Sequence, residues 1–111
     1  MLYNPEIDAI TEAIKRAVPT EQIFLFGSHA YGQPNKDSDY DFFLVIPDGE
    51  MRPLEAIRKA QCAIPSRSKA IDILANTRSG FDERKSWIAT IEKTVNQKGV
   101  LLHDGRSRPV A

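Results

Sequence analysis

Two short apolar runs constrain the fold of this chain more than any other feature of its sequence. The runs are Ile23–Phe26 and Phe42–Ile46, and both are rich in the β-branched and aromatic residues that favour strands. Each is far too short to cross a bilayer as a helix, which takes about 20 apolar residues. They therefore predict two buried strands, Gln22–Phe26 and Asp39–Ile46, and no membrane-spanning segment.

Helical patterns surround these strands. Asn4 and Pro5 form a helix start, an N-cap followed by a proline in the first turn, and Pro19 ends the apolar periodicity that follows. Pro53 predicts the start of a second helix. The apolar face expected for this second helix consists of Leu54, Ile57 and Ala60/Gln61.

The second half of the chain adds a strand, a helix and a final short strand. Ala70–Ala75 and Val100–Leu102 read as strands, and a third helix is predicted for Asp82–Gln97, ended by Gly99. The side chains expected to face inward from this third helix are Trp87, Ile88, Ile91 and Val95. The order of elements predicts an α/β (α+β) fold, with a small mixed β-sheet flanked by helices.

Length and charge limit the organisation and the partners. A chain of 111 residues has the size of one domain. We expect that domain to be residues 1–103, followed by a polar, flexible tail at 104–111. The 15 basic and 15 acidic residues cancel, so no basic field of the nucleic-acid-binding kind is present, although a nucleic-acid partner stays open. Residues 1–50 nevertheless hold three basic and nine acidic side chains, and residues 51–111 hold twelve and six.

The cysteine and histidine counts exclude two kinds of structural cross-link. The single cysteine, Cys62, excludes an intramolecular disulfide. With only two histidines beside it, a structural zinc site of Cys and His ligands is also excluded. The first residues have no signal-peptide pattern, and we expect a cytoplasmic protein.

Two of three candidate aspartates are hard to explain structurally. Asp39 and Asp41 share one face of the predicted second strand, although Asp is depleted in strands. Two like charges about 4 Å apart repel by roughly 4 kcal/mol at an effective dielectric of about 20. Mg²⁺ or Mn²⁺ would remove this repulsion. Asp72, between apolar strand residues, needs a partner or a metal as well. The alternative is that the first two cap a turn and Asp72 pairs with a surface lysine.

A glycine-containing turn, Gly27–Gly32, directly follows the first predicted strand. Its small residues let the backbone approach a ligand closely, and amide groups at such a turn can bind phosphates. The two glycines have the spacing of a P-loop, but Gln33–Pro34 stands where that motif needs Lys followed by Ser or Thr. The turn is therefore not a P-loop, and its alternative role is a tight connection from strand to helix.

Together, these segments resemble the signature of the DNA polymerase beta-like nucleotidyltransferases. That signature is Gly-Ser on a turn, then Asp-x-Asp, then a third Asp on a later strand. The matching stretches are Phe26–Gly32, Asp37–Val45 and Ile71–Ile73. The resemblance covers nearly the whole chain and is closest to the minimal nucleotidyltransferases, which are little more than the catalytic core.

The resemblance implies a fold, a site and a reaction. The fold is a polymerase beta-like nucleotidyltransferase core. The reaction moves a nucleoside monophosphate, AMP from ATP, to an acceptor hydroxyl and releases pyrophosphate, with two Mg²⁺ ions or Mn²⁺ in their place. Asp72 would also help to deprotonate the hydroxyl. The implied catalytic and metal-binding residues are Asp39, Asp41 and Asp72, and the implied nucleotide-binding residues are Gly27, Ser28 and Ser38, the last with a turn cap as its alternative.

The chain is too short to hold an acceptor domain of its own, so the acceptor is expected on a partner protein or on a second copy in a homo-oligomer. Minimal nucleotidyltransferases are commonly paired with a small helical HEPN-type protein. The resemblance thus implies a toxin–antitoxin pair in which this chain is the antitoxin and adenylylates its toxin. The alternative is a non-catalytic binding antitoxin or regulatory subunit that keeps the fold.

Basic side chains in the predicted third helix and the tail suit an acidic partner or an RNA, with a solvated helix face as the alternative. They are Arg84, Lys85, Lys93, Lys98, Arg106 and Arg108.

Overall fold

A four-stranded mixed β-sheet organises the chain. The computed structural model describes residues 5–27, 40–64, 70–87 and 90–105. Within them the strands lie in the order β3-β2-β1-β4, and four helices flank the sheet. The elements are α1 (Pro5–Ala17), β1 (Gln22–Phe26), β2 (Tyr40–Ile46), α3 (Pro53–Ala63), β3 (Ile71–Thr77), α4 (Arg78–Arg84), α5 (Ile91–Lys98) and β4 (Val100–Asp104).

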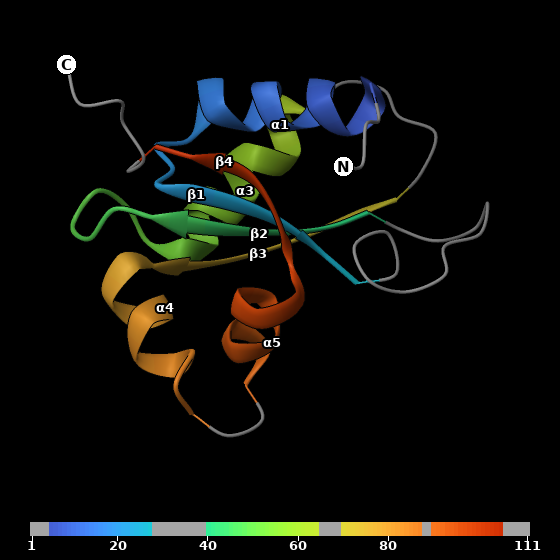
Figure 1. The fold of residues 1–111 in the computed structure, drawn as a ribbon. Helices are drawn as coiled ribbons and strands as arrows, with labels where there is room; N and C mark the ends of the chain where they lie inside the picture. The colour runs from blue at the N-terminus through green and yellow to red at the C-terminus, as the bar shows by residue number, and fades with distance from the viewer. Residues whose placement is uncertain (1–4, 28–39, 65–69, 88–89, 106–111) are drawn as a thin grey trace, which may run out of the picture.

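The helices form two layers on opposite faces of the sheet. Figure 1 shows α1 and α3 on one face and α4 and α5 on the other. Strand β1 pairs antiparallel with both β2 and β4, whereas β2 and β3 are parallel. A parallel pair needs a crossover connection, and α3 lies within it. This architecture confirms the predicted α+β class with a small mixed sheet.

Successive residues of the two central strands, β1 and β2, point to opposite faces of the sheet, and both faces are buried. Ile23, Leu25, Phe42 and Leu44 face α1 and α3 and join the larger apolar cluster. Phe24, Phe26, Phe43 and Val45 face the other layer, where they pack with Phe81 and Val95. Because helices cover both faces, these strands read as continuous apolar runs. The strand assignment made from these runs is confirmed, and Asp39 lies outside the described residues.

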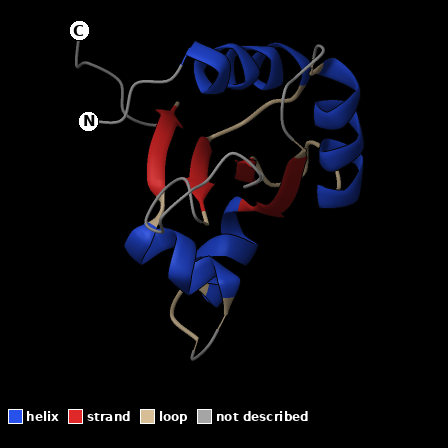
Figure 2. Cartoon of the chain, turned by 90° about the vertical axis from the view of Figure 1, so that its right-hand side faces the viewer, coloured by secondary structure: helices blue, strands red, loops and turns tan. Residues whose placement is uncertain are grey.

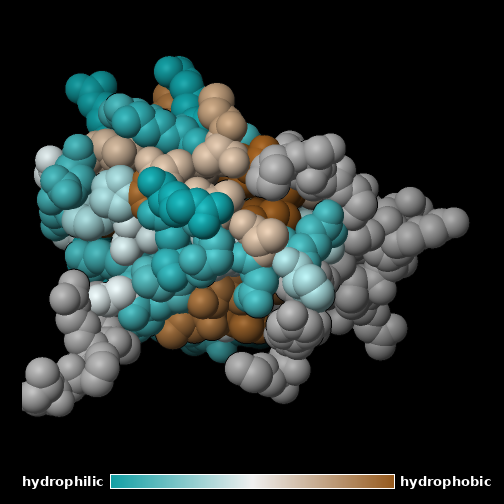
Figure 3. Space-filling view, turned by 90° about the horizontal axis from the view of Figure 1, so that it is seen from above, coloured by the Kyte–Doolittle hydropathy of each residue, from teal (hydrophilic) through white to brown (hydrophobic). Residues whose placement is uncertain are grey.

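Helix α1 begins at Pro5 as expected and ends at Ala17, before Pro19. Ile7, Ile10 and Ile14 recur at helical spacing and are all buried. The opposite side of the helix carries charged residues, and in Figure 3 most of the outer surface on this side of the molecule is hydrophilic. Asn4, the expected N-cap, lies outside the described residues.

The single helix predicted for Asp82–Gln97 is wrong, because the structure has two helices, α4 and α5, with a break between them. Thr90 explains the break. Its hydroxyl accepts a hydrogen bond from the N–H of Lys93 (3.1 Å) as the N-cap of α5, and donates one to the carbonyl of Arg84 (2.7 Å).

The break changes which side chains face inward. Trp87 and Ile91 are 45% and 38% exposed, contrary to prediction, whereas Val95 is buried as predicted. Ile88 lies outside the described residues. Phe81, in the first of the two helices, takes the core position that the sequence pattern did not indicate.

Helix α3 begins at Pro53 as predicted, but its buried face is rotated. Leu54 is 61% exposed, contrary to prediction, whereas Ala60 is fully buried as predicted, together with Ala56. Ile57 packs against the core as expected. None of the described helices has both the length and the apolar character needed to cross a membrane.

Strands β3 and β4 both end two residues beyond their predicted ends, and β3 begins at Ile71, one residue after its predicted start. Strand β3 runs to Thr77, whose side chain accepts from the N–H of Gly80 and caps α4. Strand β4 runs to Asp104, and the next residue, Gly105, donates its N–H to the carbonyl of Glu21 (2.7 Å).

Candidate active site

Two of the three predicted aspartates lie next to each other in the sheet. Asp41 on β2 and Asp72 on β3 are directly paired in the parallel register. Neighbouring strands lie about 4.8 Å apart, so the two backbones are close. Both side chains point to the α4/α5 face, because Tyr40 and Ile71 before them are buried on the other face. Asp41 is half-buried and Asp72 is exposed.

The third element of the site is Gly27, at the end of β1. Phe26, the residue before it, pairs with Asp41 across β1 and β2. Gly27 has a φ of +77°, a backbone conformation that residues with a Cβ rarely adopt. A Cβ at this position would also overlap the Asp41 carboxylate and lie 3.1 Å from its Cγ. The glycine therefore makes room for the carboxylate.

The three residues lie near strand ends that meet at one end of the sheet. Figure 2 looks onto this end of the sheet, where β1 ends and β2 and β3 begin. An antiparallel partner ends where its neighbour begins, and a parallel neighbour begins at the same end. The topology thus brings Gly27, Asp41 and Asp72 together although 45 positions separate the first from the last.

Tyr40, which lies between Asp39 and Asp41 in the sequence, fixes the start of β2. Its side chain is 2% exposed, and its hydroxyl donates to Glu6 of α1 at 2.8 Å. Its backbone N–H donates to the carbonyl of Ala70 at 3.1 Å. Sequence reasoning placed Tyr40 on the face opposite the aspartates but missed its tie to Glu6, since no local pattern links residues 34 positions apart.

Ser28, Ser38 and Asp39 lie outside the described residues, so their predicted roles rest on the sequence. Within the described ranges, no group of three or more His, Cys, Asp or Glu side chains could hold a metal ion. The described part contributes two carboxylates, Asp41 and Asp72. Hard oxygen donors of this kind fit Mg²⁺ or Mn²⁺.

A second cluster of charges lies at the opposite end of the sheet and is structural. The guanidinium of Arg78 donates to Gln22 and to Asp82, each at 2.8 Å, and lies 3.6 Å from Glu21. Burial raises the pKa of Asp82, but hydrogen bonds from Lys85 and Arg78 outweigh this effect and lower it overall. The cluster ties α4 to the start of β1.

A buried carboxylate joins α4, α5 and β3. Glu92 is 5% exposed, accepts from Arg84 Nε at 3.0 Å and accepts from the Asn76 amide at 3.1 Å. Of the basic residues suggested for an anionic partner, Arg84 is thus engaged within the fold. Lys85 is also engaged, in an ion pair with Asp82 at 3.0 Å.

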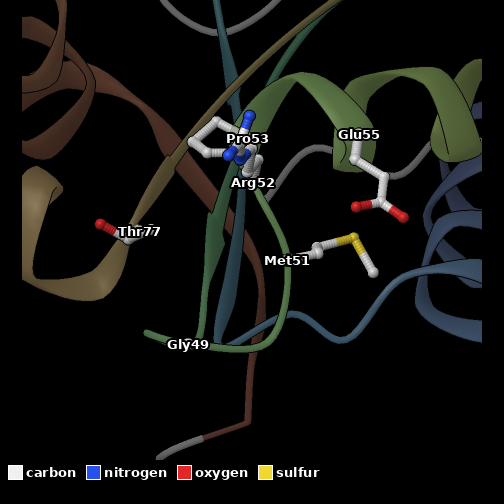
Figure 4. Close-up of a pocket in the computed structure, with 6 residues that line it drawn as sticks. All are labelled: Gly49, Met51, Arg52, Pro53, Glu55 and Thr77. Carbon is white, nitrogen blue, oxygen red and sulfur yellow. The ribbon is translucent and has the colours of Figure 1, made fainter.

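A hollow of about 410 Å³ lies far from the aspartates. It is lined by Gly49, Met51, Arg52, Pro53, Glu55 and Thr77, as Figure 4 shows. Thr77 ends β3, five residues after Asp72, which corresponds to about 17 Å along a strand. This hollow is therefore not part of the candidate active site.

Comparison with known proteins places the chain in a family. A family model described as a nucleotidyltransferase domain matches residues 7–102. The chain therefore belongs to the nucleotidyltransferase domain family, and it is a nucleotidyltransferase. The search among curated proteins found no significant match.

Two solved structures share the fold. A proposed nucleotidyltransferase from Sulfolobus solfataricus superposes with a TM-score of 0.63 at 20% identity, covering 95% of this chain and 83% of that one. A toxin–antitoxin structure with AMP-PNP superposes with a TM-score of 0.59 at 20% identity, covering 91% and 74%. These findings agree with the resemblance to a minimal nucleotidyltransferase that the glycine turn and the aspartates indicated.

Proposed function

We propose that this chain is a cytoplasmic, magnesium-dependent nucleotidyltransferase that moves AMP from ATP to a hydroxyl of a partner protein. In this proposal it is the antitoxin of a toxin–antitoxin pair, and its partner is a small helical toxin of the HEPN type. Residues 1–103 form its catalytic domain.

The observation that carries the proposal is the pairing of Asp41 with Asp72 beside Gly27. Two carboxylates in register on adjacent strands repel each other, and a hard divalent cation relieves that repulsion. The glycine end of β1 lies against one of the carboxylates. A phosphate group bound at the Gly27 backbone would therefore lie beside the Asp41 carboxylate.

Each residue has a distinct role in the proposed reaction. Asp39, Asp41 and Asp72 hold the divalent cations, which neutralise the phosphates and stabilise the charge of the transition state when bound. Gly27 and Ser28 hold the β- and γ-phosphates, and Ser38 contacts the nucleotide. Asp72, the exposed carboxylate, accepts the proton of the acceptor hydroxyl.

The reaction balances without any further reactant. The acceptor oxygen forms a bond to the α-phosphorus, and the bond between that phosphorus and the bridging oxygen breaks. Pyrophosphate leaves with the electron pair, and the hydroxyl proton passes to Asp72. The protein supplies position and charge rather than covalent chemistry.

One of the similar solved structures supports both the proposed donor and the proposed partner. The toxin–antitoxin neighbour was solved with AMP-PNP, which supports ATP as the donor here. The same neighbour supports a toxin as the partner.

Transfer of label tests the proposal directly. The purified chain is incubated with Mg²⁺, ATP labelled at the α-phosphate and the protein encoded beside it, and label on that protein is the expected result. The Asp41→Asn and Asp72→Asn variants should lose the transfer while remaining folded. Asp8→Asn, on the exposed side of α1, is the matched control and should keep full activity.

The non-catalytic alternative predicts a different result. A binding antitoxin would neutralise its partner equally well after Asp41→Asn, and no label would appear on either protein. Binding of nucleotide would still be visible, because a ligand at about 100 times its Kd stabilises a protein by about 2.7 kcal/mol. Absence of label from a folded chain would contradict the catalytic proposal, and absence of nucleotide-dependent stabilisation would contradict nucleotide binding as well.

A further inference from the structure

Strand β3 forms one edge of the sheet, and the described helices cover only one of its faces near its start. It is the terminal strand in the order β3-β2-β1-β4, so no described strand pairs with its outer edge. Ile71 and Ile73 are buried against the layer of α1 and α3. Asp72 is exposed and Leu74 is 41% exposed on the other face.

The layer of α4 and α5 ends before it reaches these two residues. Its last polar contact with β3 among the described residues is the hydrogen bond between Asn76 and Glu92. Asn76 shares a face with Leu74 and Asp72, and the three are spaced about 6.6 Å apart along the strand.

The backbone of β3 directs hydrogen-bonding groups outward at this point. The carbonyl of Ala70 accepts from Tyr40 and therefore faces β2. Successive residues of a strand point their N–H and C=O groups to alternate sides. The carbonyl of Ile71 accordingly faces away from β2, and Gln61 of α3 donates to it at 2.9 Å. By the same alternation, Ile73 and Ala75 direct their N–H and C=O groups to the outer edge.

We propose that an extended segment of the acceptor polypeptide pairs with Ile73 and Ala75 as an added strand. Residues opposite each other on paired strands share a face, with Cβ atoms about 5 Å apart. A Ser, Thr or Tyr opposite Asp72 thus presents its hydroxyl to the carboxylate, and an apolar residue two positions away covers Leu74. This inference rests on the proposed function and specifies how the acceptor is recognised.

The chemistry of this edge fits a polypeptide better than an RNA. A strand edge offers donors and acceptors at the repeat of another peptide backbone, which is the basis of recognition by strand addition. The charged side chain beside it is the carboxylate of Asp72, which repels a phosphodiester chain. The exposed Leu74 needs an apolar neighbour, which a peptide side chain supplies.

Synthetic decapeptides with a central hydroxyl-x-Leu sequence test the inference. The wild-type chain receives Mg²⁺, labelled ATP and peptides carrying Ser, Thr or Tyr, and at least one peptide should be labelled. A second set has identical side chains but N-methyl groups on alternate amides, which removes the backbone donors. Loss of about two hydrogen bonds, each worth about fivefold, should lower kcat/KM by about 25-fold.

Variants of the edge provide the complementary test. Ala75→Pro removes an outward N–H and leaves the ladder to β2 in place, which an edge strand tolerates. It should raise the KM for the peptide by about fivefold and leave the melting-temperature rise with Mg²⁺ and ATP unchanged. Ala75→Gly keeps the N–H and is the matched control. If the proline variant does not fold, the N-methylated peptides test the same contact on the wild-type chain.

The outcomes separate this inference from the proposed function. Equal labelling of normal and N-methylated peptides would overturn strand addition while leaving nucleotidyl transfer intact. Nucleotide binding with no label on any peptide would also overturn it, as would label on an RNA oligonucleotide instead. If Mg²⁺ and ATP neither stabilise the chain nor label any acceptor, the proposed function itself has failed.

Discussion

The Asp41 carboxylate lies so close to Gly27 that a Cβ on the glycine would overlap it. Gly27→Ala should therefore cost stability in two ways. The positive φ costs about 1–2 kcal/mol for a residue with a Cβ. The displaced carboxylate adds a cost of the overpacking kind, about 1–3 kcal/mol. Urea denaturation measures the sum, and nucleotidyl transfer should fall because Asp41 moves.

Gly49 supplies the matched control for this variant. It has a φ of +82°, but a Cβ there would meet nothing within 4 Å. Gly49→Ala thus carries the backbone cost alone and should leave transfer unchanged. Equal loss of stability and activity in the two alanine variants would contradict the close contact between Gly27 and Asp41.

The paired carboxylates predict a dependence on divalent cations that can be measured without a substrate. Asp41 and Asp72 are partners in the parallel register, so removing one charge relieves repulsion. Without metal, Asp72→Asn should be as stable as the wild-type chain or more stable. Added Mg²⁺ should raise the melting temperature of the wild-type chain and have a smaller effect on the variant. A larger Mg²⁺ effect in the variant would count against a shared cation.

The hydrogen bond from Tyr40 to Glu6 predicts a positioning effect on the site. Tyr40→Phe keeps the buried ring and removes a bond of about 1 kcal/mol. Because this ring lies next to Asp41 in sequence, we expect the Mg²⁺ concentration for half-maximal activity to rise. Glu6→Gln, as a single variant, keeps an oxygen acceptor for the Tyr40 hydroxyl and should keep the wild-type Mg²⁺ dependence. A loss of stability with unchanged Mg²⁺ dependence would reduce the bond to a structural role.

The strands were predictable because helices cover both faces of the sheet. Gln22–Phe26 has the predicted bounds, and Phe42–Ile46 lies within β2. The alternation that puts Asp41 on the face opposite Tyr40, and Asp72 on the face opposite Ile71, was also predictable, since it depends only on the strand period of two. The pairing of Asp41 with Asp72 was not, because register between strands 31 positions apart has no local signal.

The errors concentrate where a cap or a contact outweighs periodicity. Thr90 ends the apolar repeat that suggested one long helix, since its side chain caps α5. Trp87 lies in the break and is half exposed, with the Arg84 guanidinium 5.0 Å from its ring centre. Helix α3 buries small residues, Ala56 and Ala60, and this close packing leaves Leu54 in solvent.

The ion pair between Arg84 and Glu92 should matter more than an exposed pair. The side chain of Glu92 is 7% exposed, so Arg84→Ala leaves a buried carboxylate with one fewer donor and should cost about 1–3 kcal/mol. Lys59→Ala breaks an exposed pair with Glu55 and should change stability by less than about 0.5 kcal/mol. Denaturant unfolding of both variants makes the comparison, and equal effects would show that burial of Glu92 adds nothing.

His103 on β4 predicts a loss of stability in mild acid. Burial lowers the pKa of His103 below 6.5, and Lys15 acts in the same direction, while Asp104, Glu12 and a hydrogen bond with the backbone of Thr20 oppose it. The unfolded chain therefore binds a proton at a pH where the folded chain resists it. Stability should decrease as the pH falls from 7.5 through about 6.5 to 5.5.

A variant isolates the histidine from the other titrating groups. His103→Gln should flatten the decrease between pH 7.5 and 5.5, measured by urea denaturation at each pH. Asp48, whose pKa a hydrogen bond from the Ser79 backbone lowers below 3.8, and Asp82, also lowered, contribute stability that is lost only in stronger acid. Their effect lies outside this pH range. The same slope in the variant and the wild-type chain would therefore assign the pH dependence to groups other than His103.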